Sequence, residues 1–175
     1  MAIHEEHRAK APKVLRIAVI TVSTSRYQSI SKGVKVTDES GDRAIGLLKS
    51  FGHDVVSKKI VDDNSEMIRN ELLNCIYKDQ VQVVVLTGGT GISKRDVTIE
   101  SVRPLLDKEI YGFGEVFRSK SYEKIGAPAL LTRSLAGTIN GRLVFCLPGS
   151  PDAVETGLQL ILPELPHAFY IASSP

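Results

Sequence analysis

Short segments rich in apolar residues divide the first half of the chain, at residues 14–22, 53–61 and 83–86. Residues 17–22 and 83–86 are continuous runs, and residues 53–61 contain the apolar pairs Val55-Val56 and Ile60-Val61. Runs of this length, bounded by polar residues or glycine, are typical of strands that are buried on both faces of a parallel sheet. Between the runs, apolar residues recur three or four positions apart, which is the spacing of a helix with one buried face. This alternation predicts an α/β fold: a three-layer wound, mostly parallel sheet with helices on both faces.

Capping residues predict where the helices begin and end. Asp38 precedes the first apolar stripe, and Gly52 follows it as a stop signal. Asn64 or Ser65 precedes the second stripe in the same way. Between the first strand and the first helix, residues 27–37 are polar and predict a loop of a length that often covers a site.

The second half of the chain carries a hairpin signal. Asn140-Gly141 separates apolar segments at residues 129–139 and 142–147. This dipeptide favours the tight turn of a β-hairpin, so an antiparallel pair is expected near the C-terminal part of the sheet. Residues 152–165 then carry the apolar spacing of a last long helix.

Composition narrows the class of protein. The 175 residues are 42% apolar and 24% charged, which fits one globular domain over residues 14–175, preceded by a flexible arm at residues 1–13. A net charge of +2 gives no reason to expect nucleic acid or a membrane surface as a partner. No apolar stretch approaches the roughly 18 residues of a membrane span, and the arm contains acids, unlike a signal peptide. Two cysteines in apolar runs predict buried, reduced thiols and a cytoplasmic location.

A glycine-rich loop follows the third strand. Gly88, Gly89 and Gly91 allow a tight turn that leaves backbone N–H groups uncovered, and Asp96 or Thr98 is expected to cap a helix behind it. A glycine loop between a buried strand and a helix is a ready anion site, although most such turns are turns and nothing more.

The residues after the glycines change the balance between these two interpretations. Lys94, Arg95 and Asp96 place two cations and a carboxylate beside the backbone donors. Neither common nucleotide motif fits, because Ser93 stands where a P-loop needs glycine and Lys94 where a dinucleotide-binding loop needs it. The sequence therefore predicts phosphate binding by a loop that matches neither motif.

Polar residues also follow the other two strands. Ser23 ends the first strand, and Asp62 and Asp63 end the second. Because the carboxyl ends of parallel strands share one edge of a sheet, these side chains are expected beside the glycine loop. Other interpretations stay open at this point: Ser23 is also a common turn residue, and Asp63 can complement a helix dipole.

The loop and its neighbours together resemble a known family. The stretch TGGTGISKRDVTIE is similar to the signature loop of the MoaB/Mog family of molybdenum-cofactor biosynthesis proteins. The resemblance covers nearly the whole folded chain and includes the paired acids Asp62-Asp63. It also rests on four further motifs, in the family's order: DESG at 38–41, GFGEVFR at 112–118, TRSLAG at 132–137 and LPGSP at 147–151.

The resemblance implies an enzyme, a molybdopterin adenylyltransferase. Such a protein transfers AMP from ATP to the terminal phosphate of molybdopterin and releases pyrophosphate, with Mg²⁺. The family's two catalytic acids match Asp63 and Asp96, which would also bind the metal. Residues of the substrate pocket would be Ser23, Ser40, Gly88, Gly89, Thr90, Gly91, Glu115, Gly149 and Ser150, with Glu115 orienting the pterin or a metal-bound water. A homotrimer or homohexamer is also implied.

The chain departs from the family pattern at three positions. Thr24 stands where many members have Asp, Asp62 where Pro is frequent, and Ser134 where Ala is frequent. The change at Asp62 leaves two acids as candidate metal ligands, and the change at Thr24 motivates an alternative, a non-catalytic molybdopterin-binding or carrier protein. A CinA-like nucleotide-processing domain fits less well because the loop carries Lys94-Arg95-Asp96. The sequence does not distinguish trimer from hexamer, or a molybdenum from a tungsten pathway.

Overall fold

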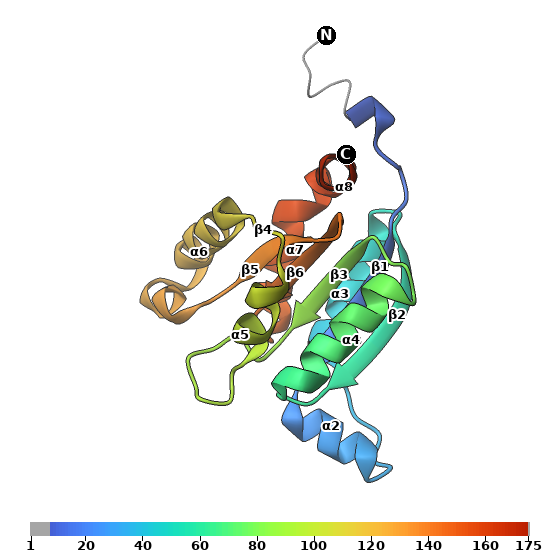
Figure 1. The fold of residues 1–175 in the computed structure, drawn as a ribbon. Coiled ribbons are helices and arrows are strands. Elements are labelled where there is room, and N and C mark those ends of the chain that lie inside the picture. The colour runs from blue at the N-terminus through green and yellow to red at the C-terminus, as the bar shows by residue number, and fades with distance from the viewer. Residues whose placement is uncertain (1–7, 175) are drawn as a thin grey trace.

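A six-stranded sheet lies between two layers of helices in the computed structural model, which describes residues 8–174 (Figure 1). The strand order is β2-β1-β3-β6-β5-β4. Strands β2, β1, β3 and β6 are parallel to one another, and β5 pairs antiparallel with both β6 and β4. The predicted mostly parallel α/β fold with an antiparallel hairpin is confirmed. The strands are β1 (Arg16–Val22), β2 (Asp54–Val61), β3 (Val83–Thr87), β4 (Lys108–Glu109), β5 (Leu135–Ile139) and β6 (Arg142–Leu147).

The helices alternate with the strands as the apolar spacing predicts. The α-helices are α2 (Thr24–Ser31), α3 (Glu39–Ser50), α4 (Ser65–Tyr77), α5 (Thr98–Val102), α6 (Tyr111–Ile125), α7 (Pro151–Ile161) and α8 (Leu165–Ser173). Short 3₁₀ segments are η1 (Arg103–Leu105), η2 (Ala127–Leu131) and η3 (Leu162–Glu164). Asp38 and Asn64 cap α3 and α4 through their side chains, as expected from the sequence.

The central strands are buried on both faces. Ile17, Val83 and Leu143 are partners in register on β1, β3 and β6, and they face the core under α3, α6, α7 and α8. The residue after each of them points the other way, into the core under α4 and α5. A strand with apolar side chains on both faces shows no alternation in its sequence, which is why unbroken apolar runs marked these strands.

The prediction of a polar loop at residues 27–37 is wrong for the first part of this segment. Residues 24–31 form α2, and the Ser23 hydroxyl caps this helix by accepting a hydrogen bond from the backbone N–H of Arg26. No residue of α2 is buried, so the helix carries no apolar stripe for periodicity to detect. A local cap, and not a core contact, defines where this helix begins.

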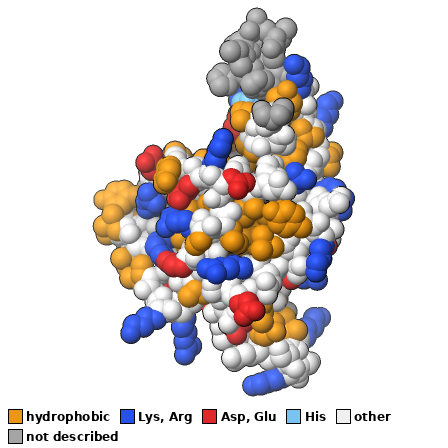
Figure 2. Space-filling view, in the orientation of Figure 1, with side chains coloured by type: hydrophobic (Ala, Val, Ile, Leu, Met, Phe, Trp, Pro, Cys, Tyr) orange, Lys and Arg blue, Asp and Glu red, His pale blue; other side chains and the backbone are white. Residues whose placement is uncertain are grey.

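The apolar segment at residues 129–139 is a strand only from Leu135 onwards. Its first part belongs to η2, where the Leu130 and Leu131 side chains are exposed. Figure 2 shows apolar side chains gathered at the left margin of the molecule, where α6 and η2 lie. The sequence pattern identified an apolar segment correctly, but it could not tell a surface segment from a buried strand.

Two further expectations concern the C-terminal half. Asn140 and Gly141 have φ values of 47° and 70°, so the predicted hairpin turn is confirmed. The single helix expected at residues 152–165 is wrong, because α7 ends at Ile161 and α8 begins at Leu165. Pro163 and Pro166 lie at this break, and each removes a backbone N–H that a continuous helix would use.

Part of the chain lies outside the sheet and its helices. The arm expected at residues 1–13 falls partly outside the described residues, and its flexibility stays a prediction. Within the described part, Arg8 forms an ion pair with Glu164. No helix between residues 8 and 174 has the length and apolar character needed to cross a membrane.

A buried carboxylate anchors α3 to β1. Asp38 is 2% exposed; its carboxylate accepts hydrogen bonds from Thr21 Oγ1 at 2.8 Å and Gly41 N at 3.2 Å, and Lys58 Nζ lies 3.2 Å away. Burial alone would raise the pKa of Asp38, but these hydrogen bonds and the Lys58 charge together lower it.

This anchor predicts a loss of stability in acid. Because the pKa of Asp38 is lower in the folded protein than in the unfolded chain, its contribution is present above about pH 4 and is lost as pH falls through the folded-state value. We expect Asp38→Asn to reduce the free energy of unfolding at pH 7 and to flatten its dependence on pH below about 4, measured by urea unfolding. Asp42→Asn is the control, since Asp42 contacts the same Lys58 but is exposed. Parallel pH profiles for the wild type and Asp38→Asn would contradict the prediction.

Candidate active site

A pocket of about 900 Å³ opens at the carboxyl ends of β1, β3 and β6. After β1 the chain first continues to β2 on one side and then to β3 on the other, so the pocket lies where the strand order reverses. Open α/β sheets bind ligands at such points. Eight of the residues that the sequence singled out line it: Ser23, Asp63, Gly88, Gly89, Thr90, Gly91, Asp96 and Gly149.

Backbone contacts hold the strand ends together around the pocket. Gly88 N donates to Leu147 O at 3.0 Å, and Thr87 Oγ1 donates to Pro148 O at the same distance. Gly88 has φ 95°, and a Cβ on it would lie 2.3 Å from the backbone oxygen of Val22. Glycine is therefore required at this position by both the backbone conformation and the close approach of β1.

The glycine loop presents a row of unpaired donors. Within residues 8–174, nothing accepts a hydrogen bond from the backbone N–H groups of Gly89, Thr90, Gly91 or Ile92. Successive N–H groups of this kind form an anion-binding concavity. The helix behind the loop, α5, has five residues, so the loop itself supplies the donors and the helix N-terminus adds little.

The expected capping of this helix is wrong. The N-cap position is Val97, and no side chain caps α5. The Asp96 carboxylate instead accepts a hydrogen bond from Ser93 N at 2.9 Å, and Thr98 Oγ1 donates to Gly88 O at 2.8 Å. Both side chains are used to shape the loop, which is a tertiary requirement that a local capping pattern does not reveal.

Both candidate catalytic carboxylates lie against the glycine loop. A Cβ on Gly89 would lie 2.6 Å from Asp63 Oδ1, and a Cβ on Gly91 would lie 2.7 Å from Asp96 Oδ2. The structure thus brings Asp63, which follows β2, and Asp96, which follows the glycines, to one pocket beside the unpaired N–H groups.

Thr24 holds the acidic pair after β2. Asp63 Oδ2 accepts hydrogen bonds from Thr24 N at 2.9 Å and from Thr24 Oγ1 at 3.1 Å. Asp62 Oδ1 lies 2.5 Å from the same hydroxyl and accepts from Asp63 N at 2.8 Å. Asp63 lines the main pocket, whereas Asp62 borders a smaller adjoining cavity of about 280 Å³.

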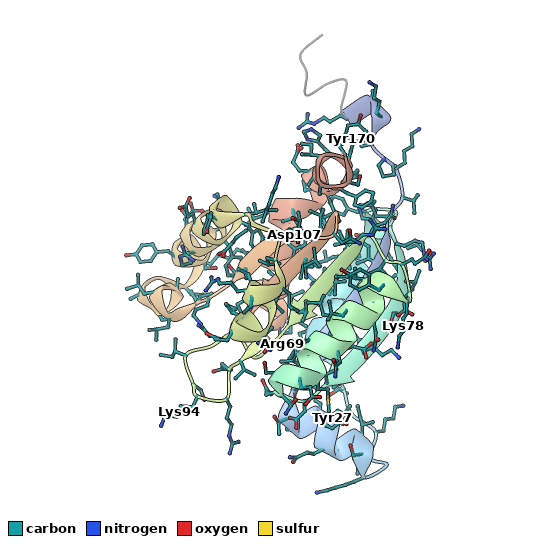
Figure 3. All side chains as sticks on the ribbon, viewed as in Figure 1. Tyr27, Arg69, Lys78, Lys94, Asp107 and Tyr170 are labelled. Atoms are coloured by element: carbon teal, nitrogen blue, oxygen red, sulfur yellow. The ribbon has the colours of Figure 1, made fainter. Side chains whose placement is uncertain are left out.

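Positive charge borders the pocket at the glycine loop. Arg95 lines both cavities and, among the described residues, makes no ion pair. Its neighbour Lys94 projects from the tip of the loop, on the same end of the molecule as Tyr27 of α2 (Figure 3). The described residues contain no group of three or more His, Cys, Asp or Glu side chains that could hold a metal. A cation at Asp63 and Asp96 would therefore take its other oxygen ligands from water or a bound substrate.

Three residues that the sequence singled out lie away from the main pocket. Ser40 is buried in the first turn of α3, where its hydroxyl lies 3.4 Å from Asp38 Oδ1. Ser150 caps α7 and borders a separate cavity of about 190 Å³. Glu115 is exposed on α6. The roles given to them stay predictions.

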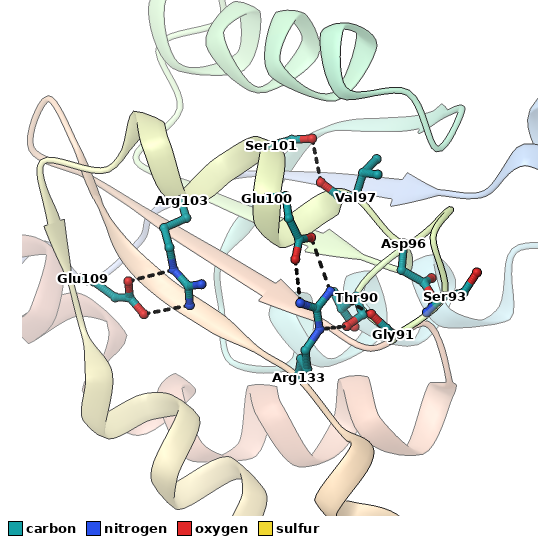
Figure 4. A network of polar contacts seen from close by, with 10 residues as sticks. All are labelled: Thr90, Gly91, Ser93, Asp96, Val97, Glu100, Ser101, Arg103, Glu109 and Arg133. Atoms are coloured by element: carbon teal, nitrogen blue, oxygen red, sulfur yellow. Dashed lines mark hydrogen bonds and ion pairs between the residues drawn. The ribbon is translucent and has the colours of Figure 1, made fainter.

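Arg133 is a pocket residue whose position the sequence did not reveal. It is a charged residue within the apolar segment at residues 129–139, and an ion pair is the simplest explanation for a charge in such a segment. The structure shows that ion pair, with Glu100, and also shows the guanidinium bound to carbonyl groups of the glycine loop (Figure 4).

Comparison with known proteins shows what the chain is similar to. The family profile described as a probable molybdopterin binding domain matches residues 18–167. A Bacillus cereus protein named molybdenum cofactor biosynthesis protein B is 49% identical over 164 residues, covering 93% of this chain and 93% of that protein. A Pyrococcus furiosus protein named molybdopterin adenylyltransferase is 47% identical over 169 residues, covering 93% of this chain and 94% of that protein.

A solved structure shares the fold as well as the sequence. The crystal structure of the tungsten cofactor synthesizing protein MoaB from Pyrococcus furiosus superposes with a TM-score of 0.82 at 46% identity. The alignment covers 94% of this chain and 100% of that one.

Proposed function

The chain belongs to the molybdopterin-binding domain family of molybdenum-cofactor biosynthesis, and we propose that it is a molybdopterin adenylyltransferase. The resemblance inferred from the sequence motifs is thereby confirmed at the level of the family. The proposed reaction takes AMP from ATP to the terminal phosphate of molybdopterin and releases pyrophosphate. Its main support in the structure is that unpaired N–H groups and two carboxylates lie together at one edge of the sheet.

Asp63 and Asp96 fit a magnesium ion that is shared with substrate phosphates. Mg²⁺ is commonly bound by one or two carboxylates plus phosphate oxygens and water, and not by a complete protein cage. The two acids beside the loop are a donor set of this kind. Of the pair after β2, Asp63 is the proposed ligand, because Asp62 faces the adjoining cavity. When bound, Mg²⁺ would neutralise phosphate charge and orient the phosphates.

The chain's own contribution to the reaction is positioning. The N–H groups of the glycine loop would bind phosphate oxygens and hold the α-phosphorus of ATP in line with the attacking phosphate oxygen of molybdopterin. A bond forms between that oxygen and the α-phosphorus, and the bond from the α-phosphorus to the bridging oxygen breaks. Pyrophosphate leaves with the electron pair. Arg95, a cation without an ion-pair partner among the described residues, would offset the charge of the departing pyrophosphate.

A direct assay separates this proposal from the alternative. We expect the purified protein to release pyrophosphate from ATP when both molybdopterin and Mg²⁺ are present, and to stop when EDTA is added. Titrating ATP and molybdopterin separately by calorimetry should show binding of both. Binding of molybdopterin without any effect of ATP, and without pyrophosphate release, would favour a non-catalytic carrier instead.

We also propose a homotrimer or homohexamer that associates through α6 and η2. The exposed side chains Tyr111, Ile125, Leu130 and Leu131 are 72%, 56%, 76% and 61% accessible. Apolar surface gathered in this way is typical of an interface between chains. We expect light scattering to give the mass of three or six chains, and Leu130→Glu to give a smaller species. A monomeric wild type would contradict this.

The buried, unpaired Cys75 and Cys146 fit a cytoplasmic location.

A further inference from the structure

Arg133, which precedes β5, binds two carbonyl groups of the glycine loop. Its Nε donates to Thr90 O at 2.9 Å and its Nη2 donates to Gly91 O at 2.7 Å. Arg133 lies in the segment between η2 and β5, more than 40 residues from the loop along the chain. Figure 4 shows the guanidinium reaching to these two consecutive carbonyl groups. It therefore acts on the two peptide units in the middle of the loop.

Binding these carbonyls also fixes the direction of two N–H groups. In a trans peptide the N–H points opposite to the C=O of the same unit, and the described part of the chain contains no cis peptide. When Thr90 O and Gly91 O point at Arg133, the N–H groups of Gly91 and Ile92 point away from it. Both belong to the row of donors with no acceptor in the described structure. A cation at the carbonyl end also polarises each peptide unit, which makes its N–H a stronger donor.

Glu100 holds the guanidinium in place. Glu100 Oε1 accepts from Arg133 Nη1 at 2.6 Å, and Oε2 accepts from Nη2 at 3.3 Å. The hydrogen bond from Arg133 is the main cause that lowers the pKa of Glu100, so the carboxylate is charged at neutral pH. Four guanidinium–protein hydrogen bonds leave little donor capacity for a substrate, because an Arg side chain has five N–H groups.

The ends of the loop are secured without Arg133. Gly88 N binds Leu147 O, and Thr98 N binds Gly89 O at 2.9 Å, so the start of the loop is tied to β6 and to α5. Asp96 closes the far end through Ser93 N. Arg133 contacts the stretch between these ties, where the unpaired donors lie.

We propose that Arg133 is a positioning residue that aims the Gly91 N–H group at the phosphate oxygens of a substrate in the pocket that Gly91 lines, with Glu100 setting the orientation of Arg133. This inference rests on the proposed function, since it assumes that the loop binds phosphate. Arg133 does not itself contact the reacting atoms. It acts through the peptide units of the loop.

The test compares Arg133→Gln and Arg133→Lys with a matched control. Arg103→Gln removes an ion pair of the same kind, in which Arg103 Nε and Nη2 bind Glu109 at 3.0 and 3.2 Å, and Arg103 makes no hydrogen bond to the described residues of the loop (Figure 4). Affinity for inorganic pyrophosphate is measured by calorimetry. The amide resonance of Gly91 is followed in protein labelled with [¹⁵N]glycine.

We expect Arg133→Gln to weaken pyrophosphate binding by about tenfold or more and to shift the Gly91 resonance, because two charged hydrogen bonds to the loop are lost. In the assay, KM for ATP should rise more than kcat falls. Arg133→Lys should recover part of the affinity, since a lysine supplies the charge but not the two-pronged geometry. Arg103→Gln should leave pyrophosphate binding and the Gly91 resonance unchanged.

The inference and the proposed function fail in different ways. If the wild type binds pyrophosphate but releases none from ATP and molybdopterin, the proposed function is wrong, and the role of Arg133 is still decided by the binding data. If Arg133→Gln and Arg103→Gln bind pyrophosphate equally well and share the wild-type Gly91 resonance, the inference is wrong. Absence of pyrophosphate binding in the wild type also overturns it.

Discussion

Replacing Asp63 with Asn is expected to slow pyrophosphate release by at least about 100-fold, the effect typical of removing a charge or donor that stabilises a transition state. Asn keeps the size of Asp63, and its Oδ1 can still accept the hydrogen bonds that Thr24 donates. The fold should therefore survive while the negative charge that would hold Mg²⁺ is lost. Initial rates of pyrophosphate release, measured across a magnesium titration, test this. Asp96→Asn should behave in the same way.

Asp62→Asn is the matched control for this prediction. Asp62 is the adjacent acid and shares the Thr24 hydroxyl, but it borders the smaller cavity and not the main pocket. We expect its rate to fall by about tenfold, the lower end of the effect of removing a residue that supports a metal ligand without binding the metal. Equal losses for Asp62→Asn and Asp63→Asn would show that the acids act as a pair. A larger loss for Asp62→Asn would reverse the proposed assignment.

Gly88→Ala is expected to destabilise the protein and to abolish phosphate binding together. Alanine at φ 95° is strained, at a cost of roughly 1–2 kcal/mol. Its Cβ would also lie 2.3 Å from the backbone oxygen of Val22, so β1 and the loop must move apart, at a further cost of about 1–3 kcal/mol. Chemical unfolding gives the change in stability, and calorimetry with inorganic pyrophosphate gives the loss of binding.

Gly52→Ala separates strain from crowding. Gly52 has a similar φ of 83°, but a Cβ on it would meet nothing within 4 Å. We expect only the strain cost there, roughly 1–2 kcal/mol, with phosphate binding unchanged. If the two variants lose equal stability and Gly88→Ala still binds pyrophosphate, close packing of the loop on β1 is not what shapes the site.

Local pattern predicted most of the sheet, for an identifiable reason. β1, β3 and β6 are buried on both faces, so their sequences are continuous apolar runs that need no knowledge of their neighbours. The Asn140-Gly141 turn was equally local, because its backbone conformation depends on two residues. The pattern failed where neighbours decide the outcome. α2 has no buried residue, and the exposed leucines of η2 belong to an apolar segment that resembles a buried strand.

The candidate site was predictable in part for the same reason. Asp63, Asp96 and the glycines stand at the ends of predicted strands, so topology alone placed them at one edge of the sheet. Ser40 and Ser150 belong to motifs of the same resemblance, yet Ser40 is buried in the first turn of α3 and Ser150 caps α7. A motif specifies which residues are present, but it does not specify which way each side chain points.

The sequence by itself determined most of the alternation of strands and helices, the glycine loop and the family to which the chain belongs. These follow from apolar periodicity, turn chemistry and short motifs, which are properties of neighbouring residues. The tertiary structure alone decided that Thr24 holds Asp63 and that Arg133 and Glu100 fix the middle of the loop. Those contacts join residues more than 30 positions apart, and a hydrogen bond between distant residues depends on where the fold places them.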